Sequence, residues 1–359
     1  MATGLPNAYK HLRDNQQPLR FRNDGTFRIL HLTDIHEVHP DMDDDENRSV
    51  PINKSAETIH VIEDCLDRTN PDLVVFGGDN ISGHWEEFTY DYMAHTIRKI
   101  IAPIVKRKIP LAIVFGNHDS ERADTLPFLQ RENQINIYAE YDNFRGCFNE
   151  EDVFGCGNYT VPILSHNSDR INWNIWCIDS NDYLRNDDYT IQKNPDGYGF
   201  VHDDQIEWYE KKSVELREKN GGKPVPSILF QHIPVLQEYA FCEETTKGTP
   251  GAFEKDGKYF VPKKGVFSQG SMREAPCPTP QNGKQFESWV KMGDIVAAFF
   301  GHDHTNTFIG EIEKIKLIQS LGAGYHSYGI ERGGRLIVLH ENTREFDTET
   351  LIVKRIFIK

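Results

Sequence analysis

Apolar runs and stretches of helical periodicity alternate along the first third of the chain. Residues 27–32, 73–76 and 111–115 are apolar enough to predict buried strands. Between them, residues 54–68 and 86–107 repeat apolar side chains at the spacing of amphipathic helices. With right-handed crossovers, this order predicts three parallel strands whose carboxyl ends share one edge of a sheet.

The remainder of the chain predicts one further helix and two groups of strands. The helix is expected at about residues 203–218, with Asp203 as its N-cap. Apolar strands are expected at residues 159–164, 171–179, 226–230 and 294–300, and β-rich runs at 308–312, 316–320, 336–339 and 351–358. The β-rich runs suggest antiparallel pairing.

Two stretches depart from this alternation. Residues 1–25 are polar, so we expect an N-terminal tail that wraps the surface. At about residues 241–283 the composition turns to Gly, Pro, Lys, Glu and Ser, which predicts a long insertion over the active face.

Composition narrows the class of protein. A chain of 359 residues with 38% hydrophobic content can bury a sizeable core in one or two domains. The formal net charge of −15 argues against a nucleic-acid surface, which needs a basic face. The N-terminus has no apolar signal region, and no stretch approaches the roughly 18 apolar residues of a spanning helix. We therefore expect a cytoplasmic protein with no membrane segment, or a secreted one if a signal peptide has been removed; the oligomeric state stays open.

The six cysteines are too sparse for a disulfide framework, and none stands in a C-x-x-C pair that would suggest structural zinc. Bridges between Cys147 and Cys156, or between Cys242 and Cys277, remain open.

Polar side chains of metal-ligand type follow five of the predicted strands. One such histidine is more often a hydrogen-bonded structural residue than a ligand, but five independent coincidences are improbable. Carboxylates, imidazoles and one carboxamide, without a thiolate, suit Mn, Fe or Zn. One tetrahedral ion needs fewer ligands than these seven, whereas two ions sharing a carboxylate would use them all. The predicted ligands are Asp34, His36, Asp79, Asn117, His232, His302 and His304.

The segment after the central strand, residues 116–119, has a second interpretation. Its Gly-Asn-His-Asp sequence could be a turn that caps the next helix, because these residue types favour turns and N-caps. Taken alone, the segment fits a strand end that carries ligands and a helix-capping turn equally well.

As an ordered set, the motifs resemble the calcineurin-like metallophosphoesterase superfamily. They are D-x-H at residues 34–36, G-D at 78–79, G-N-H-D at 116–119, a lone His232 and G-H-x-H at 301–304. The resemblance implies an α/β fold, a two-sheet β-sandwich flanked by helices, with one catalytic domain over residues 26–359. It also implies a phosphatase acting on phosphomonoesters of small molecules or phosphoproteins. Phosphodiester or nucleotide cleavage at the same site is the alternative, and a metal-bound scaffold without catalysis is a third.

The resemblance also assigns roles to the individual residues. It implies one metal ion held by Asp34, His36 and His304, a second held by Asn117, His232 and His302, and Asp79 as the bridge. A hydroxide shared by the two ions would attack phosphorus in line. His118 lies outside the metal shell and would stabilise the transition state or protonate the leaving oxygen.

A second resemblance is to small plant and fungal phosphatases that are filed with purple acid phosphatases. It rests on Gly-Tyr-His-Ser-Tyr-Gly at residues 324–329 and Gly-Asn-Tyr at 157–159. Purple enzymes carry a colour-giving tyrosine where this chain has Ser82, so the iron-loaded protein should be colourless. Tyr325 and His326 are predicted substrate contacts, with ordinary loop packing an equal alternative.

Four more polar residues have weaker assignments. Arg332 and Arg335 could meet a phosphate, but solvation is the stronger expectation. Asp119 and Asp303 are expected to hydrogen-bond histidines of the metal shell.

Overall fold

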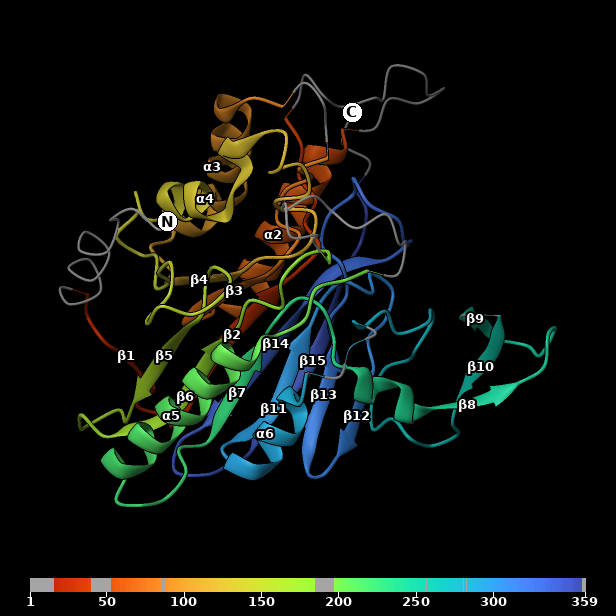
Figure 1. Cartoon of the computed structure of the whole chain (residues 1–359). Coiled ribbons are helices and arrows are strands. Elements are labelled where there is room, and N and C mark those ends of the chain that lie inside the picture. Colours follow the sequence, from red (N-terminus) through yellow and green to blue (C-terminus); the bar gives the residue numbers. More distant parts are fainter. Residues whose placement is uncertain are drawn as a thin grey trace.

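Two β-sheets packed face to face form the centre of the protein, and helices cover both outer faces (Figure 1). The structure is a computed structural model that describes residues 16–39, 53–84, 88–184, 197–255, 257–279, 281 and 283–356. The predicted α/β sandwich is confirmed. No helix in these ranges is both long and apolar enough to cross a membrane.

The five-stranded sheet has the order β15-β14-β2-β3-β4. Its three parallel strands are β2 (Thr26–Leu32), β3 (Leu73–Gly77) and β4 (Leu111–Val114), as the apolar runs predict. The C-terminal strands β14 (Arg332–His340) and β15 (Phe346–Val353) pair antiparallel, and β14 joins β2. The last strand therefore begins and ends earlier than the expected run 351–358.

The seven-stranded sheet has the order β1-β5-β6-β7-β11-β13-β12. Strands β6, β7, β11 and β13 are parallel, while β5 runs antiparallel to β6 and β12 runs antiparallel to β13. Part of the expected N-terminal tail adds to this sheet, because β1 pairs with β5. The strands are β1 (Leu19–Arg20), β5 (Tyr159–Leu164), β6 (Ile171–Cys177), β7 (Ser227–Phe230), β11 (Ile295–Phe300), β12 (Ile309–Ile312) and β13 (Ile315–Gln319).

Helices α2 (Lys54–Thr69), α3 (Tyr90–Lys106) and α5 (Asp203–Lys219) match the three predicted helices. The N-cap of α5 is His202 rather than Asp203; its backbone N–H donates to Gln205, which closes a capping box. Four short helical elements of the described residues were not predicted: α4 (Arg131–Tyr138), α6 (Gln285–Met292) and the 3₁₀ turns η3 (Pro127–Leu129) and η4 (Leu236–Phe241).

Alternating side chains of the strands fill separate cores. On β2, Leu30 packs in the core shared with α2, α3 and α4, whereas Ile29 packs between the two sheets. On the seven-stranded sheet, Trp176 faces a third core that contains residues of α5 and α6. Three apolar cores thus hold the two sheets and their helices together. They fix the relative position of the strand ends, where the polar residues meet at one edge.

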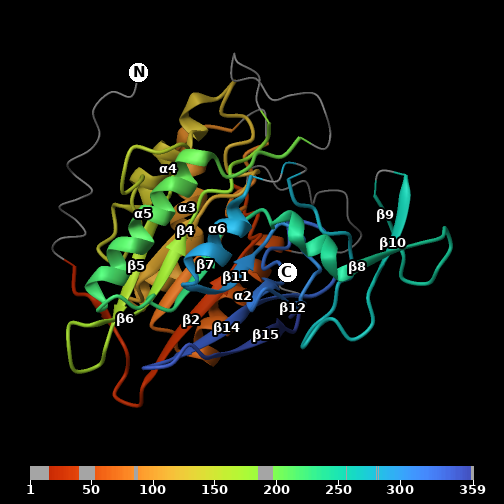
Figure 2. The same ribbon diagram turned by 60° about the horizontal axis from the view of Figure 1, so that its bottom comes forward.

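The predicted insertion contains a small antiparallel sheet of β8 (Cys242–Thr245), β10 (Lys258–Pro262) and β9 (Phe253–Lys255). This sheet projects away from the two main sheets (Figures 1 and 2). The chain then returns to the sandwich, where Glu274 accepts hydrogen bonds from Thr305 and Tyr328.

All six cysteines are free thiols. Neither of the bridges left open by the sequence forms.

Candidate metal centre

Strand ends of both sheets deliver the predicted ligands to one edge of the sandwich. Asp34 and His36 follow β2, Asp79 follows β3 and Asn117 follows β4; His232 follows β7, and His302 and His304 follow β11. This placement reflects topology, since parallel strands in each sheet end on the same side.

Four of the ligands have a left-handed backbone. The φ angles are 51° at Asp34, 47° at His36, 50° at Asp79 and 72° at His302. Side chains other than glycine adopt this region rarely and at a cost, and such strain concentrates at functional sites. Neighbouring loops hold the turns: the backbone N–H of Asp34 donates to Gly78 at 3.0 Å, and that of His36 donates to Asp79 at 2.8 Å. The turns aim side chains at one point rather than along their strands.

The loops approach so closely that glycine is required at one position. A Cβ added at Gly116 would collide with the carboxylate and backbone of Asp79. This contact brings the loop after β4 against the loop after β3.

The first group of candidate ligands is Asp34, His36, Asp79 and His304, all buried. Nε2 of His304 lies 3.2 Å from Nε2 of His36 and 3.3 Å from Oδ1 of Asp34. Nε2 of His36 lies 3.5 Å from Oδ2 of Asp79. These atoms converge on one point from three strand ends.

The second group is Asp79, His232 and His302, so Asp79 belongs to both groups. Nδ1 of His232 lies 2.9 Å from the carbonyl oxygen of Gly77, which turns Nε2 toward Asp79 at 3.1 Å. Asn117 is linked to this group through two tyrosines. Its Nδ2 donates to the Tyr183 hydroxyl at 2.8 Å, and the Tyr183 ring stacks on that of Tyr198, which contacts His302.

Several buried atoms in these groups lack a hydrogen-bond partner within the described residues. They are Oδ2 of Asp79, Oδ1 of Asn117 and the Nε2 atoms of His232 and His302. Orphaned polar atoms are costly in a protein interior. Because all four are ligand atoms of one region, the residues fit bound metal ions, and the sharing of Asp79 fits two.

The protonation states of several ligands suit a metal. Burial lowers the pKa of His302 to about 3 and that of His36 well below its usual range, so both imidazoles are neutral. Burial works against ionisation of Asp34 and Asp79, but the neighbouring imidazoles outweigh it and lower the pKa of each carboxyl. For His232, the Asp79 carboxylate outweighs burial and raises the pKa to about 9. A metal would therefore have to displace a proton from His232.

His118 stands beside the two groups with a different set of contacts. Its backbone N–H donates to Oδ1 of Asp79 at 2.8 Å, and its Nδ1 lies 2.6 Å from Oε2 of Glu121. Burial lowers the pKa of His118, but Asp79 and Glu121 outweigh it and raise the value to about 9. The side chain is 34% exposed, unlike those of the buried candidate ligands.

Three tyrosines around the ligands were not predicted. Besides Tyr183, the ring of Tyr198 stands edge-on to His302 with centroids 4.6 Å apart. Tyr328 stacks on His304 at 4.1 Å. Among the three tyrosines, only Tyr328 had a sequence signal, as part of the 324–329 motif. Glu121 was also not predicted, although its three-residue spacing from His118 was a signal in the sequence.

Tyr325 and His326 take other positions in the 324–329 loop. The Tyr325 ring lies 5.2 Å from the guanidinium carbon of Arg332 and 4.7 Å from that of Arg355. Nδ1 of His326 lies 4.0 Å from Oε2 of Glu37, next to His36. A substrate contact for either residue stays a prediction.

The expected solvation of Arg332 and Arg335 is wrong, since both are buried. Arg335 donates to the carbonyl oxygens of Thr307 and Gln319, each at 2.9 Å. Arg332 donates to the carbonyl oxygen of Ser327 at 2.7 Å. Burial is tolerated because backbone oxygens satisfy the guanidinium groups.

The expected histidine contacts of Asp119 and Asp303 are also wrong. Asp119 accepts backbone N–H groups of Asn80 at 2.8 Å and Gly116 at 2.8 Å, so it ties the loops after β3 and β4 together. Asp303 accepts instead from the side-chain amide of Gln319 at 3.3 Å.

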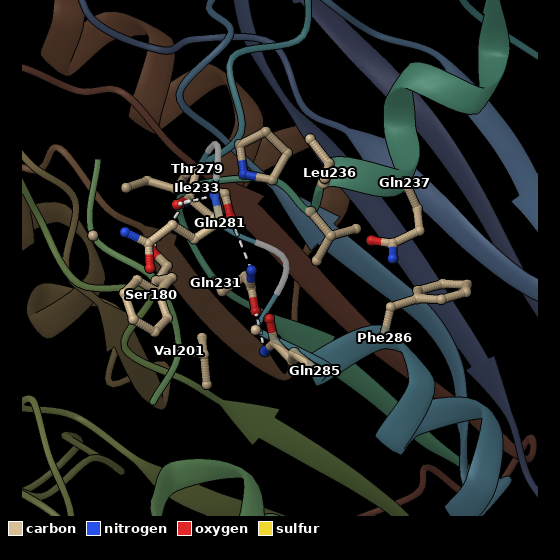
Figure 3. A pocket seen from close by; sticks show the side chains of 15 residues that line it. Ser180, Val201, Gln231, Ile233, Leu236, Gln237, Thr279, Gln281, Gln285 and Phe286 are labelled. Atoms are coloured by element: carbon tan, nitrogen blue, oxygen red, sulfur yellow. Dashed lines mark hydrogen bonds between the residues drawn. The ribbon is translucent and has the colours of Figure 1, made fainter. Parts of the chain in front are cut away.

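A hollow of about 380 Å³ open to solvent lies beside the centre (Figure 3). Its lining includes Gln231 and Ile233, which flank His232, but none of the seven predicted ligands. Four glutamines contribute, at positions 231, 237, 281 and 285, and the lining carries no charged side chain.

This fold and these paired ligand groups define a class of metal-binding α/β sandwich proteins. The chain belongs to the calcineurin-like phosphoesterase family, whose model matches residues 27–306. The family suspected from the motifs is therefore confirmed.

Named relatives and one solved structure agree with this placement. "Probable inactive purple acid phosphatase 14" of Arabidopsis thaliana is 28% identical over 332 residues, covering 88% of this chain and 74% of that protein. "Phosphatase DCR2" of Saccharomyces cerevisiae is 28% identical over 296 residues, covering 81% of this chain and 46% of that protein. A dimetal phosphatase from Danio rerio shares the fold, with a TM-score of 0.51, 14% identity, and coverage of 90% of this chain and 98% of that one.

Proposed function

We propose that this protein is a binuclear metal-dependent phosphatase that hydrolyses phosphomonoesters. The observation that carries the proposal is the position of Asp79, which belongs to both groups of buried ligands and faces His36 on one side and His232 on the other. A carboxylate in that position is what two adjacent ions require as a bridge.

The ligands divide as the family resemblance implies. One ion would be held by Asp34, His36 and His304, the other by Asn117, His232 and His302, with Asp79 common to both. When bound, the ions would supply a water of lowered pKa as nucleophile and take up charge on the phosphoryl oxygens.

His118 would act on the leaving group. Glu121 occupies its Nδ1 at 2.6 Å, so Nε2 is the ring nitrogen left to carry a proton to the leaving oxygen. Among the protein groups, Asp79 and Glu121 outweigh burial and raise the pKa of His118, which favours a protonated ring.

The word "inactive" in the name of the Arabidopsis relative raises the alternative of a scaffold without catalysis. Loss of activity in such centres would follow from loss of a ligand or of the acid. Here all seven ligand side chains and His118 are present and surround one region, which supports the enzyme.

The proposal is tested on purified protein loaded separately with Mn²⁺, Zn²⁺ or iron. We expect release of p-nitrophenol from p-nitrophenyl phosphate to exceed release from bis-p-nitrophenyl phosphate, with two ions per chain by elemental analysis. A preference for the diester would favour a phosphodiesterase, and no turnover of either compound with two ions bound would favour the scaffold.

A further inference from the structure

Tyr183 and Tyr198 form a pair over the second group of ligands. Their backbones make an isolated antiparallel bridge, and the N–H of Gly199 donates to Asp182 at 2.8 Å. The two rings are nearly parallel, with centroids 5.7 Å apart and planes at 25°. The backbone thus fixes both rings relative to the centre.

The two hydroxyl groups face different neighbours. That of Tyr183 accepts a hydrogen bond from Nδ2 of Asn117, whereas that of Tyr198 interacts with the Cys277 thiol. The pair therefore offers two similar phenols, and only the hydroxyl group of Tyr183 is hydrogen-bonded to a predicted ligand; Tyr198 contacts His302 through its ring alone.

The bond to Asn117 determines what the Tyr183 hydroxyl can still do. Oδ1 of Asn117 is buried, has no hydrogen-bond partner among the described residues and is the amide's ligand atom. An amide that turns Oδ1 to a metal can offer only its NH₂ group to the tyrosine, so the phenol oxygen must be the acceptor.

The hydrogen of the Tyr183 hydroxyl is then left over. Across the part of the chain that the structure describes, the bond from Asn117 is the one hydrogen bond this hydroxyl makes. The side chain is neither fully buried nor fully exposed. The Tyr183 hydroxyl is thus an unused donor that is bonded to the same amide whose Oδ1 would bind a metal. It is suited to donate to an anion bound at the same centre.

We propose that Tyr183 is a substrate-binding residue whose hydroxyl donates a hydrogen bond to an oxygen of the phosphoryl group held at the metal centre. The inference rests on the proposed function and names a contact for the phosphoryl end of the substrate. The phosphate product would be bound in the same way, so inorganic phosphate is a direct probe.

The test compares Tyr183→Phe with Tyr198→Phe, which removes the same oxygen from the neighbouring ring. Binding of inorganic phosphate to the Mn²⁺-loaded full chain is measured by isothermal titration calorimetry, with Mn²⁺ content determined in parallel. Loss of a hydrogen bond to a charged group should weaken phosphate binding by about 10- to 100-fold in Tyr183→Phe. Tyr198→Phe should stay within about twofold of the parent protein, and both variants should keep the parent's Mn²⁺ content.

Four results would overturn the assignment. Phosphate affinity could be unchanged in Tyr183→Phe or absent in the parent protein, the two variants could lose affinity equally, or Tyr183→Phe could lose an ion and so act only through Asn117. Because the readout is binding, it is separate from turnover. If the loaded protein hydrolyses no phosphomonoester yet shows the expected isotherms, the proposed function fails while the role of Tyr183 stands.

Discussion

Nδ1 of His118 lies 2.6 Å from Oε2 of Glu121, three residues further along the chain. The carboxylate holds the imidazole in one orientation and with one tautomer when the ring is neutral. Sequence spacing hints at this pair, but only the turn after Asn117 brings the two side chains together.

His118→Ala should keep both metal ions and lower turnover by roughly 10²- to 10⁴-fold, the usual range for general acid catalysis. The loss should be smaller for aryl than for alkyl phosphates, because a good leaving group needs little protonation. Glu121→Gln preserves an acceptor for Nδ1 and should be milder than Glu121→Ala. Steady-state kinetics on one aryl and one alkyl phosphate decide this: an equal defect of His118→Ala on both would remove the acid role.

His232→Ala should release one of two metal ions, since its Nε2 faces Asp79 at 3.1 Å within the second group. His166→Ala is the matched control, because His166 pairs with Glu341 outside both ligand groups. Elemental analysis after metal loading and gel filtration measures the number of ions that each variant retains. Full retention of two ions by His232→Ala would remove this residue from the ligand set.

The iron-loaded protein should show no tyrosinate charge-transfer band in the visible spectrum. Position 82 carries a serine whose hydroxyl donates to the backbone oxygen of His36 at 3.1 Å, so it holds a loop and offers no phenolate. An absorption spectrum of the loaded protein checks this, with the Tyr183→Phe protein as the control for the phenol that is hydrogen-bonded to Asn117. A strong tyrosinate band in the parent protein would contradict the prediction, and its loss in Tyr183→Phe would identify Tyr183 as the source.

We expect Glu238 to make the stability of the protein depend on pH. It is buried, accepts from the Gln319 amide at 3.1 and 3.2 Å, and burial raises its pKa from 4.5 to about 8. Between these values the folded state holds a proton that the unfolded state has lost, so the free energy of unfolding falls as pH rises from about 4.5 to 8.

Glu238→Gln mimics the protonated acid and should remove this slope. Relative to the parent protein, the variant should gain on the order of a few kcal/mol in free energy of unfolding between pH 5 and pH 8. Urea unfolding at the two pH values measures the change. A difference between variant and parent that is the same at both pH values would show that Glu238 ionises normally in the folded state.

The main sheets and the convergence of polar side chains at one edge could be predicted because each depends on a local pattern. Apolar runs of strand length mark β2, β3 and β4, and polar residues directly after them mark the edge. Parallel pairing then brings distant strand ends together without further information.

The features that could not be predicted from the sequence depend on tertiary contacts, which no local pattern encodes. Helices α4 and α6 have eight residues each, too short for a clear periodic signal. Arg335 is buried because carbonyl oxygens of Thr307 and Gln319 meet it, and Tyr183 reaches Asn117 across 66 positions of sequence. Such pairings are set by the tertiary fold.

The most direct test of a binuclear phosphatase is a titration of the metal-free protein with Mn²⁺ while hydrolysis of p-nitrophenyl phosphate is followed. With protein concentration well above the dissociation constants, activity should rise until two equivalents are bound and then level off, because the shared Asp79 makes the second ion necessary. A plateau at one equivalent, or no phosphate release at any ratio although two ions bind, would contradict the account.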